Sequence, residues 1–194
     1  MARSTRTADD WARAALEAIA EGGVAAVRVE SLAPRVGASK GSFYWHFADR
    51  PALVAAALAR WEELSTEAII RDVEAVADPA ERLRRLFSRA FGDPRGGRVD
   101  AALAADADDP VVGPVLRRVT ERRIAFLRAA YADLGLGERE AGSRALAAYA
   151  AFLGLFAVRR IVPGDVPAAG EPLDAFLHDL LGALSPQEPR VSGA

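Results

Sequence analysis

Apolar residues recur at three- and four-residue intervals along most of the chain, with breaks rich in Gly, Pro and Asp between the runs. This periodicity is typical of amphipathic helices, and no run favours a strand, so the sequence predicts an all-α protein. Aspartates stand where N-caps are expected, and some are followed closely by a proline suited to a first helical turn. The expected caps are Asp9 or Asp10, Asp49, Asp78 and Asp109. A short helix over Val99–Asp106 is expected after breaks at Gly92-Asp93-Pro94 and Gly96-Gly97.

Residues 30–49 predict two short helices joined by a tight turn. An apolar stripe leads up to Gly37, which stands where a helix-terminating glycine belongs. Ser39 is placed as the N-cap of the next helix, in which Phe43 and Phe47 share one face that packs inward. Two short helices around a glycine-containing turn are the helix-turn-helix geometry, whose second helix enters the DNA major groove.

The run Gly37–Leu53 resembles the DNA-binding signature of TetR-family transcriptional regulators, and Ala14–Gly23 resembles the first helix of that family. The resemblance covers about the first third of the chain. It implies a three-helix DNA-binding head and a helical body that dimerises and holds a small-molecule pocket. Two positions depart from the family pattern: Arg28 replaces the usual Ser or Thr cap, and Pro34 removes a backbone donor inside the second helix.

The DNA-contacting residues are expected at the start of the second short helix, which opens with Lys40, the only lysine of the chain. By resemblance, the Tyr44 hydroxyl and Arg50 contact phosphates, although Arg50 could equally be an ordinary solvated arginine. The basic terminus that carries Arg3 and Arg6 is either a frayed end or an arm that touches DNA. The candidates for DNA contact are Ser39, Lys40, Gly41, Ser42, Tyr44, Trp45, His46, Arg50, Arg28, Arg3 and Arg6.

The composition argues against an enzyme. The chain has no cysteine, and its two histidines, His46 and His178, are far apart and have no Glu three residues before them. No glycine-rich phosphate loop is present, and the carboxylates Asp106, Asp108 and Asp109 fit helix capping. We therefore expect no catalytic residues, no cofactor and no metal ion.

The charge distribution favours DNA contact through one end only. Residues 1–60 carry a net charge of +2, whereas the remainder carries −4. No apolar run follows Met1, so we expect a cytoplasmic protein that does not enter a membrane.

Aromatic residues on the helical stripes of the body are the only indication of a ligand site. For each of them, ordinary core packing is the simpler interpretation, and the family resemblance favours a pocket for the set. The pocket candidates are Trp61, Phe87, Phe91, Leu103, Phe126, Tyr149 and Phe152. Few ionisable residues interrupt these stripes, so a hydrophobic or aromatic effector is expected, oriented by Arg122, Arg123 or the Tyr149 hydroxyl.

The last two apolar runs predict a homodimer. Residues 145–158 are apolar on every face but are too few to span a bilayer, and residues 173–184 carry a regular leucine stripe. Two helices from each chain would form a four-helix bundle. The expected interface residues are Leu153, Phe156, Phe176, Leu177, Leu180 and Leu181.

The sequence thus predicts a DNA-binding domain over residues 1–50, a ligand-binding and dimerisation domain over 51–186 and a disordered tail over 187–194. The predicted function is sequence-specific transcriptional regulation, as a repressor that a small hydrophobic ligand releases from a palindromic operator. Two alternatives are a regulator that responds to no ligand and a small helical enzyme or carrier.

Overall fold

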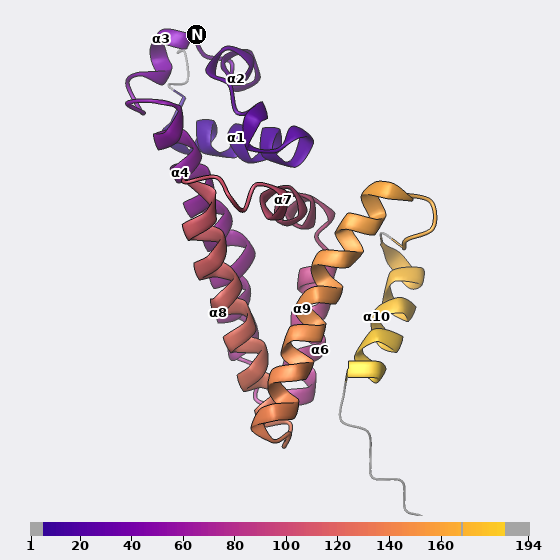
Figure 1. Ribbon diagram of the computed structural model, residues 1–194. Helices are drawn as coiled ribbons and strands as arrows, with labels where there is room; N and C mark the ends of the chain where they lie inside the picture. Colours follow the sequence, from indigo (N-terminus) through magenta and orange to yellow (C-terminus); the bar gives the residue numbers. More distant parts are fainter. Residues whose placement is uncertain (1–5, 168, 185–194) are drawn as a thin grey trace, which may run out of the picture. The chain divides into compact units, whose positions relative to one another are not determined.

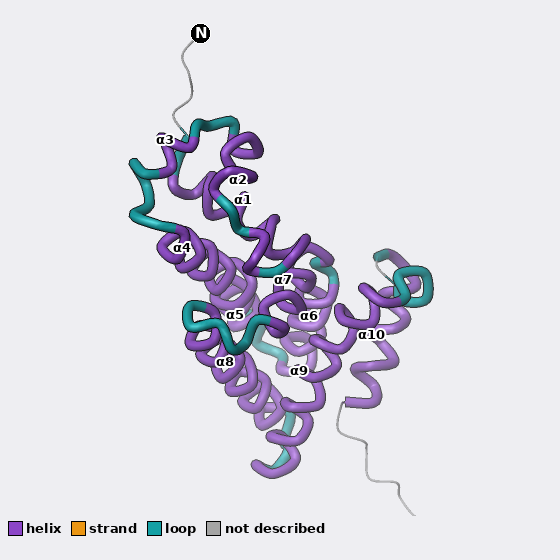
Figure 2. Tube along the Cα trace, turned by 45° about the horizontal axis from the view of Figure 1, so that its top comes forward, coloured by secondary structure: helices purple, strands orange, loops and turns teal. Residues whose placement is uncertain are grey.

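A computed structural model describes residues 6–167 and 169–184 of the chain, and these residues form helices and turns without a strand (Figures 1 and 2). The prediction of an all-α fold is therefore confirmed. The α-helices are α1 (Ala8–Gly22), α2 (Val29–Val36), α3 (Lys40–Phe43), α4 (Arg50–Glu62), α5 (Ala68–Glu74), α6 (Pro79–Phe91), α7 (Pro94–Ala105), α8 (Val112–Asp133), α9 (Glu138–Ile161) and α10 (Gly170–Leu184). A 3-10 turn, η1 (Val24–Ala26), and a π-helical turn, η2 (Glu63–Glu67), complete the path.

The chain divides into two compact units. Unit 1 comprises residues 1–68 and 94–121, and unit 2 comprises residues 69–93 and 122–194. Each unit is thus built from two separate stretches of chain, and α8 runs from one unit into the other. The functional division at residue 50 stays a prediction, because compactness alone does not say which residues bind DNA or ligand. The predicted tail, 187–194, lies outside the described residues.

Unit 1 is organised around α1, which packs against α2, α4 and α7. Trp11 on α1 is fully buried, and its ring meets that of Phe43 edge-on, with 5.5 Å between the centroids. Leu53, Leu58 and other apolar residues of α4 join the same core. This cluster fixes the short α3 helix to the rest of the unit, because four residues alone do not form a stable helix.

Most helix boundaries follow the caps expected from the sequence. Asp49 accepts a hydrogen bond from the backbone N–H of Ala52 at 2.8 Å, and Asp78 caps α6 in the same way. The expectation for α1 was wrong. Thr7 is the N-cap, and Asp10 makes the reciprocal bond of a capping box, accepting from the Thr7 N–H at 2.9 Å.

One expectation about the middle of the chain also needs correction. The helix predicted from Val99 begins at Pro94 and includes Gly96 and Gly97. Pro94 stands at the helix start, where its missing N–H is not needed, and packing of α7 on α1 overcomes the low helix propensity of glycine. Helix α4 passes directly into the π-helical turn η2 after Glu62.

Unit 2 has its own core, formed by residues from α6, α9, α10 and the second half of α8. Phe87 and Phe91 stack with 5.4 Å between ring centroids, and Phe91 meets Phe152 edge-on at 5.6 Å. Helices α9 and α10 contact each other, as Figures 1 and 2 both show. The fully buried Tyr131 lies in this core.

Helix α9 spans 24 residues, more than the apolar run suggested. By length and composition it is the one helix in the described part of the chain that could cross a membrane. Core helices of soluble proteins also satisfy this criterion. Ala141, Ala145, Ala148 and Phe156 of α9 are buried in the protein, but only 28% of its apolar window is buried.

Candidate DNA-binding interface

The helix-turn-helix is formed by α2, the turn at residues 37–39 and α3. Gly37 ends α2 with φ 68° and ψ 38°, a left-handed conformation that glycine adopts without strain. Ser39 then caps α3 by accepting a hydrogen bond from the Ser42 N–H at 3.2 Å. Pro34 is accommodated within α2, so the second helix forms despite the proline.

Helix α3 and the turn after it separate buried from exposed aromatic rings. Phe43 and Phe47 are buried and stack with 5.6 Å between their centroids. Tyr44 is 59% exposed and Trp45 is 88% exposed. His46 is half-buried beside Phe47, with 6.4 Å between the ring centroids. The inward-facing role predicted for Phe43 and Phe47 is confirmed, and Tyr44 and Trp45 are left to meet a partner.

Lys40 forms an ion pair on this surface. Its Nζ donates to Glu30 Oε1 at 2.5 Å, and both side chains are exposed. This hydrogen bond lowers the pKa of Glu30 and raises the pKa of Lys40, so both groups are charged near neutral pH. The only lysine of the chain therefore stands beside a carboxylate from the first turn of α2.

Arg50 has a structural role that the sequence did not indicate. Its Nε donates to the carbonyl oxygen of Val27 at 2.7 Å, and its Nη2 donates to that of Val24 at 2.6 Å. Arg28 makes no side-chain cap at the start of α2. Arg6 lies beside the turn, because a Cβ placed at Gly37 would be 3.2 Å from Arg6 Nη2. Arg3 lies outside the described residues.

The residues predicted to line a ligand pocket belong to separate cores. Trp61 and Leu103 lie in the core of unit 1, whereas Phe87, Phe91 and Tyr149 lie in that of unit 2, with Phe152 packed against them. Phe126 packs in a third cluster, with Ile70 and Val73. The guanidinium carbon of Arg123 lies 5.7 Å from the centroid of the Phe152 ring, which brings one predicted orienting residue to this set.

The predicted dimer residues are mostly covered by the chain itself. Phe156 and Leu177 are buried, and the other four are half-buried against the core of unit 2. A different face of α9 is uncovered. It is formed by Leu146, Ala147, Ala150, Ala157, Val158 and Ile161, all exposed and on one side of the helix. The sequence did not reveal this stripe, because a helix that is apolar on every face does not show which side the core covers.

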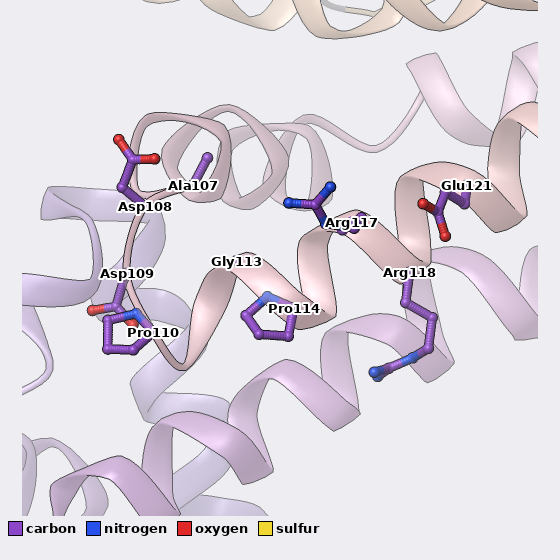
Figure 3. Close-up of a pocket in the computed structure, with 9 residues that line it drawn as sticks. All are labelled: Ala107, Asp108, Asp109, Pro110, Gly113, Pro114, Arg117, Arg118 and Glu121. Atoms are coloured by element: carbon purple, nitrogen blue, oxygen red, sulfur yellow. The ribbon is translucent and has the colours of Figure 1, made fainter.

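Unit 1 also has a surface hollow of about 570 Å³ next to the start of α8 (Figure 3). Its walls carry charges of both signs, from Asp108, Asp109, Arg117, Arg118 and Glu121. In Figure 3 Arg118 points away from Arg117; it forms a two-pronged ion pair with Glu62 of α4, at 2.9 Å and 2.5 Å. None of the predicted pocket residues lines this hollow. Within the described residues, no three carboxylate or histidine side chains gather as metal ligands.

Comparisons with known proteins agree with this geometry. Residues 12–57 match the family model described as bacterial regulatory proteins, tetR family. A transcriptional regulator from Rhodococcus sp. Rha1 superposes with a TM-score of 0.77 and 27% identity, covering 92% of this chain and 95% of that chain. No curated protein matches the sequence.

Two further structures share the fold at lower identity. A TetR-family transcriptional regulator from Agrobacterium tumefaciens has a TM-score of 0.76 and 21% identity, over 92% of this chain and 97% of that chain. The transcriptional regulator FadR from Bacillus subtilis, solved in complex with stearoyl-CoA, has a TM-score of 0.69 and 17% identity, over 92% of this chain and 97% of that chain.

The fold and the exposed α3 surface define a helix-turn-helix transcriptional regulator that binds DNA. Its DNA-binding domain, over residues 12–57, is of the TetR-family type.

Proposed function

We propose that this regulator is a repressor that reads its operator with α3 and its flanking residues. The observation that carries this proposal is the exposure of Trp45 and Tyr44, whereas the neighbouring Phe43 and Phe47 are buried. Two neighbouring exposed aromatic rings directly after α3, with Lys40 at its start, suit the groove edge and its phosphates. Ser39, Lys40, Gly41, Ser42 and His46 complete the proposed contact surface, with Arg6 and Arg28 at its margins. Arg3, outside the described residues, stays a predicted contact. The internal bonds of Arg50 favour a positioning role for that residue.

The test uses a DNA duplex that the wild-type protein selects from a random-sequence library. Lys40→Ala and Tyr44→Phe should each weaken binding to that duplex in fluorescence anisotropy while the melting temperature changes little, because both side chains are exposed. A lost phosphate contact should lower affinity for all sequences and reduce the salt dependence by about one unit of slope. Unchanged affinity in both variants would remove α3 from the interface.

We also propose that the chain acts as a homodimer. The exposed stripe residues of α9 are all apolar, and a second copy of the same helix would cover them. A two-fold dimer presents two recognition helices, which accounts for the expectation of a palindromic operator. The domain responsible is the helical body after residue 50, and we place the protein in the cytoplasm, where soluble regulators of this family bind DNA.

The proposed effector is a small hydrophobic molecule bound by the aromatic side chains of unit 2. These rings form a continuous series, because Phe152 contacts Phe91, Tyr149 and Phe156, with centroids 5.6, 6.2 and 5.2 Å away. Arg123 beside Phe152 would favour an anionic or polar end group. Release from DNA would follow a shift of the population toward a conformation that binds DNA less well. Helix α8 belongs to both units, and in unit 1 Arg118 of α8 is bonded to Glu62 of α4. A coupling of ~1–3 kcal/mol is sufficient.

Acyl-CoA thioesters of increasing chain length are suitable probes, because the similarly folded FadR was solved with stearoyl-CoA. A hydrophobic effector should raise the melting temperature and release the selected duplex, with coenzyme A alone as the control. Phe152→Ala should weaken both effects. If neither these thioesters nor a panel of aromatic compounds shifts the melting temperature, the ligand-independent regulator becomes the better description.

A further inference from the structure

Three hydrogen bonds between the backbone and two charged side chains hold the turn between α1 and α2. The Val24 N–H donates to Asp106 Oδ2 at 2.8 Å, across 82 positions of sequence. On the other side, the carbonyl oxygens of Val24 and Val27 accept from Arg50 at 2.6 and 2.7 Å. Asp106 directly follows α7, and Arg50 is the first residue of α4. The η1 turn is therefore tied to two other helices of unit 1.

The backbone at Gly23 is shaped for this contact. Gly23 ends α1 with φ 71° and ψ −175°, a conformation that favours glycine. A Cβ at this position would lie only 3.0 Å from Asp106 Oδ2. The carboxylate thus approaches the backbone as closely as it does because no side chain intervenes. The N-cap residue of η1, Gly23, makes no side-chain bond, so Asp106 supplies the acceptor for the Val24 N–H at the start of the turn.

The position of the helix-turn-helix depends on this turn. Helix α2 begins two residues after Val27, and its N-cap, Arg28, supplies no side-chain bond. The start of α2 is therefore set by the turn that precedes it. Arg50 begins α4 seven residues after Phe43, where α3 ends. The η1 turn therefore leads directly into α2, the first helix of the helix-turn-helix. It is also bonded to Arg50 at the start of α4, the helix that follows the helix-turn-helix.

Asp106 is itself held at a defined junction. Its N–H donates to the carbonyl oxygen of Leu103 at 3.0 Å, and its carbonyl accepts from the Asp109 N–H at 3.0 Å. The Asp109 carboxylate then accepts from the N–H groups of Val111 and Val112, at 2.8 and 3.1 Å, where α8 begins. This succession of tight turns fixes the Asp106 backbone relative to α7 and α8.

We propose that Asp106 is a positioning residue for operator recognition. Through Val24 it holds η1, and through η1 and Arg50 it sets the placement of α2 and α3 on α1 and α4. Loss of the carboxylate would loosen this placement and leave α3 intact but poorly aligned with the base edges. Because base contacts need fixed geometry and phosphate contacts tolerate variation, specific binding should suffer more than non-specific binding. The inference rests on the proposed reading of DNA by α3.

The test compares Asp106→Ala with Asp106→Asn. Both remove one negative charge, but the asparagine keeps an oxygen that can accept from the Val24 N–H. Affinities are measured at one salt concentration for the duplex selected by the wild-type protein and for a random-sequence duplex. Asp106→Ala should lower the ratio of specific to non-specific affinity by about tenfold, whereas Asp106→Asn should retain most of it. Amide exchange at Val24 should be faster in Asp106→Ala than in Asp106→Asn.

The possible outcomes distinguish a failure of the proposed function from a failure of the positioning role of Asp106. If the wild-type protein selects no duplex, the proposed function fails before Asp106 is tested. If it selects one and folded Asp106→Ala keeps the wild-type ratio, the positioning role is overturned. A proportional loss of specific and non-specific binding also overturns it, because that result indicates only a smaller folded fraction. Should Asp106→Ala unfold, Asp106→Glu is compared instead, since it keeps the charge but displaces the carboxylate by one methylene; an unchanged ratio there contradicts the proposal.

Discussion

Lys40 and Glu30 face each other across the helix-turn-helix, with 2.5 Å between Lys40 Nζ and Glu30 Oε1. The lysine expected to approach DNA is thus accompanied by a carboxylate that phosphates would repel. Since both side chains are exposed, their attraction contributes little to folding. The pair matters instead for binding, because DNA must compete with Glu30 for Lys40.

Glu30→Gln should therefore strengthen DNA binding. Removing the carboxylate frees Lys40 and abolishes repulsion with the backbone, so affinity for specific and random duplexes should rise by a similar factor, about two- to tenfold at low salt. Glu17→Gln, the same charge change at an exposed position of α1, controls for net charge. Equal effects of the two substitutions in fluorescence anisotropy would mean that the Lys40–Glu30 pair has no particular influence on binding.

Arg50→Lys should reduce stability although it keeps the charge. Lysine cannot reproduce the two divergent hydrogen bonds that Arg50 makes to Val24 and Val27, so the free energy of unfolding should fall by about 1–3 kcal/mol. Urea denaturation measures the change, and Arg35→Lys, at a surface ion pair with Glu21, should cost much less. A full-stability Arg50→Lys variant with weakened DNA binding would support the phosphate contact expected from the sequence.

Arg50 also illustrates what could be predicted from the sequence. Local signals were sufficient for the caps at Ser39, Asp49 and Asp78 and for the end of α2 at Gly37, because each depends on neighbours within a few residues. The bonds of Arg50 reach back 23 and 26 residues, and no local pattern marks them.

Long-range packing explains the remaining differences. Gly96 and Gly97 suggested a break, yet α7 continues through them where it packs against α1. The contact between Asp106 and Val24 joins residues from different stretches of the chain, so Asp106 looked like an ordinary helix-end carboxylate. Likewise, an all-apolar α9 gave no indication that Phe156 faces inward and Ile161 outward.

Leu146→Glu should separate the proposed dimer without unfolding the monomer. Leu146 is 59% exposed on the α9 stripe, so a charge there remains hydrated in the isolated chain but would be buried and unpaired in the interface. Leu64→Glu introduces the same change at a leucine of unit 1 that is 51% exposed, and it should leave the assembly intact. Sedimentation velocity at micromolar concentration distinguishes the two states. A wild-type protein that sediments as a monomer contradicts the dimer, and a dimeric Leu146→Glu places the interface elsewhere.

Tyr131→Phe should leave the fold intact and make it less sensitive to alkali. The Tyr131 side chain is fully buried, its hydroxyl has no hydrogen-bond partner among the described residues, and burial raises its pKa to about 12. Removing an unpartnered hydroxyl should be neutral or stabilise the protein by about 1 kcal/mol at neutral pH. A phenol in the unfolded chain ionises near pH 10, so between about pH 10 and 12 the unfolded state releases a proton that the folded state retains.

Rising pH therefore favours unfolding of the wild-type protein. The contribution of Tyr131 to the free energy of unfolding should decline by about 1.4 kcal/mol between pH 8 and pH 11. Tyr131→Phe should lack this decline, so its advantage over wild type should grow as the pH rises. Urea denaturation at several pH values measures the difference, with Tyr44→Phe as the control because it removes the same hydroxyl from an exposed ring. Parallel pH profiles for wild type and Tyr131→Phe would show that the Tyr131 hydroxyl is hydrated or bonded in solution, and its isolation in the unit 2 core would then be refuted.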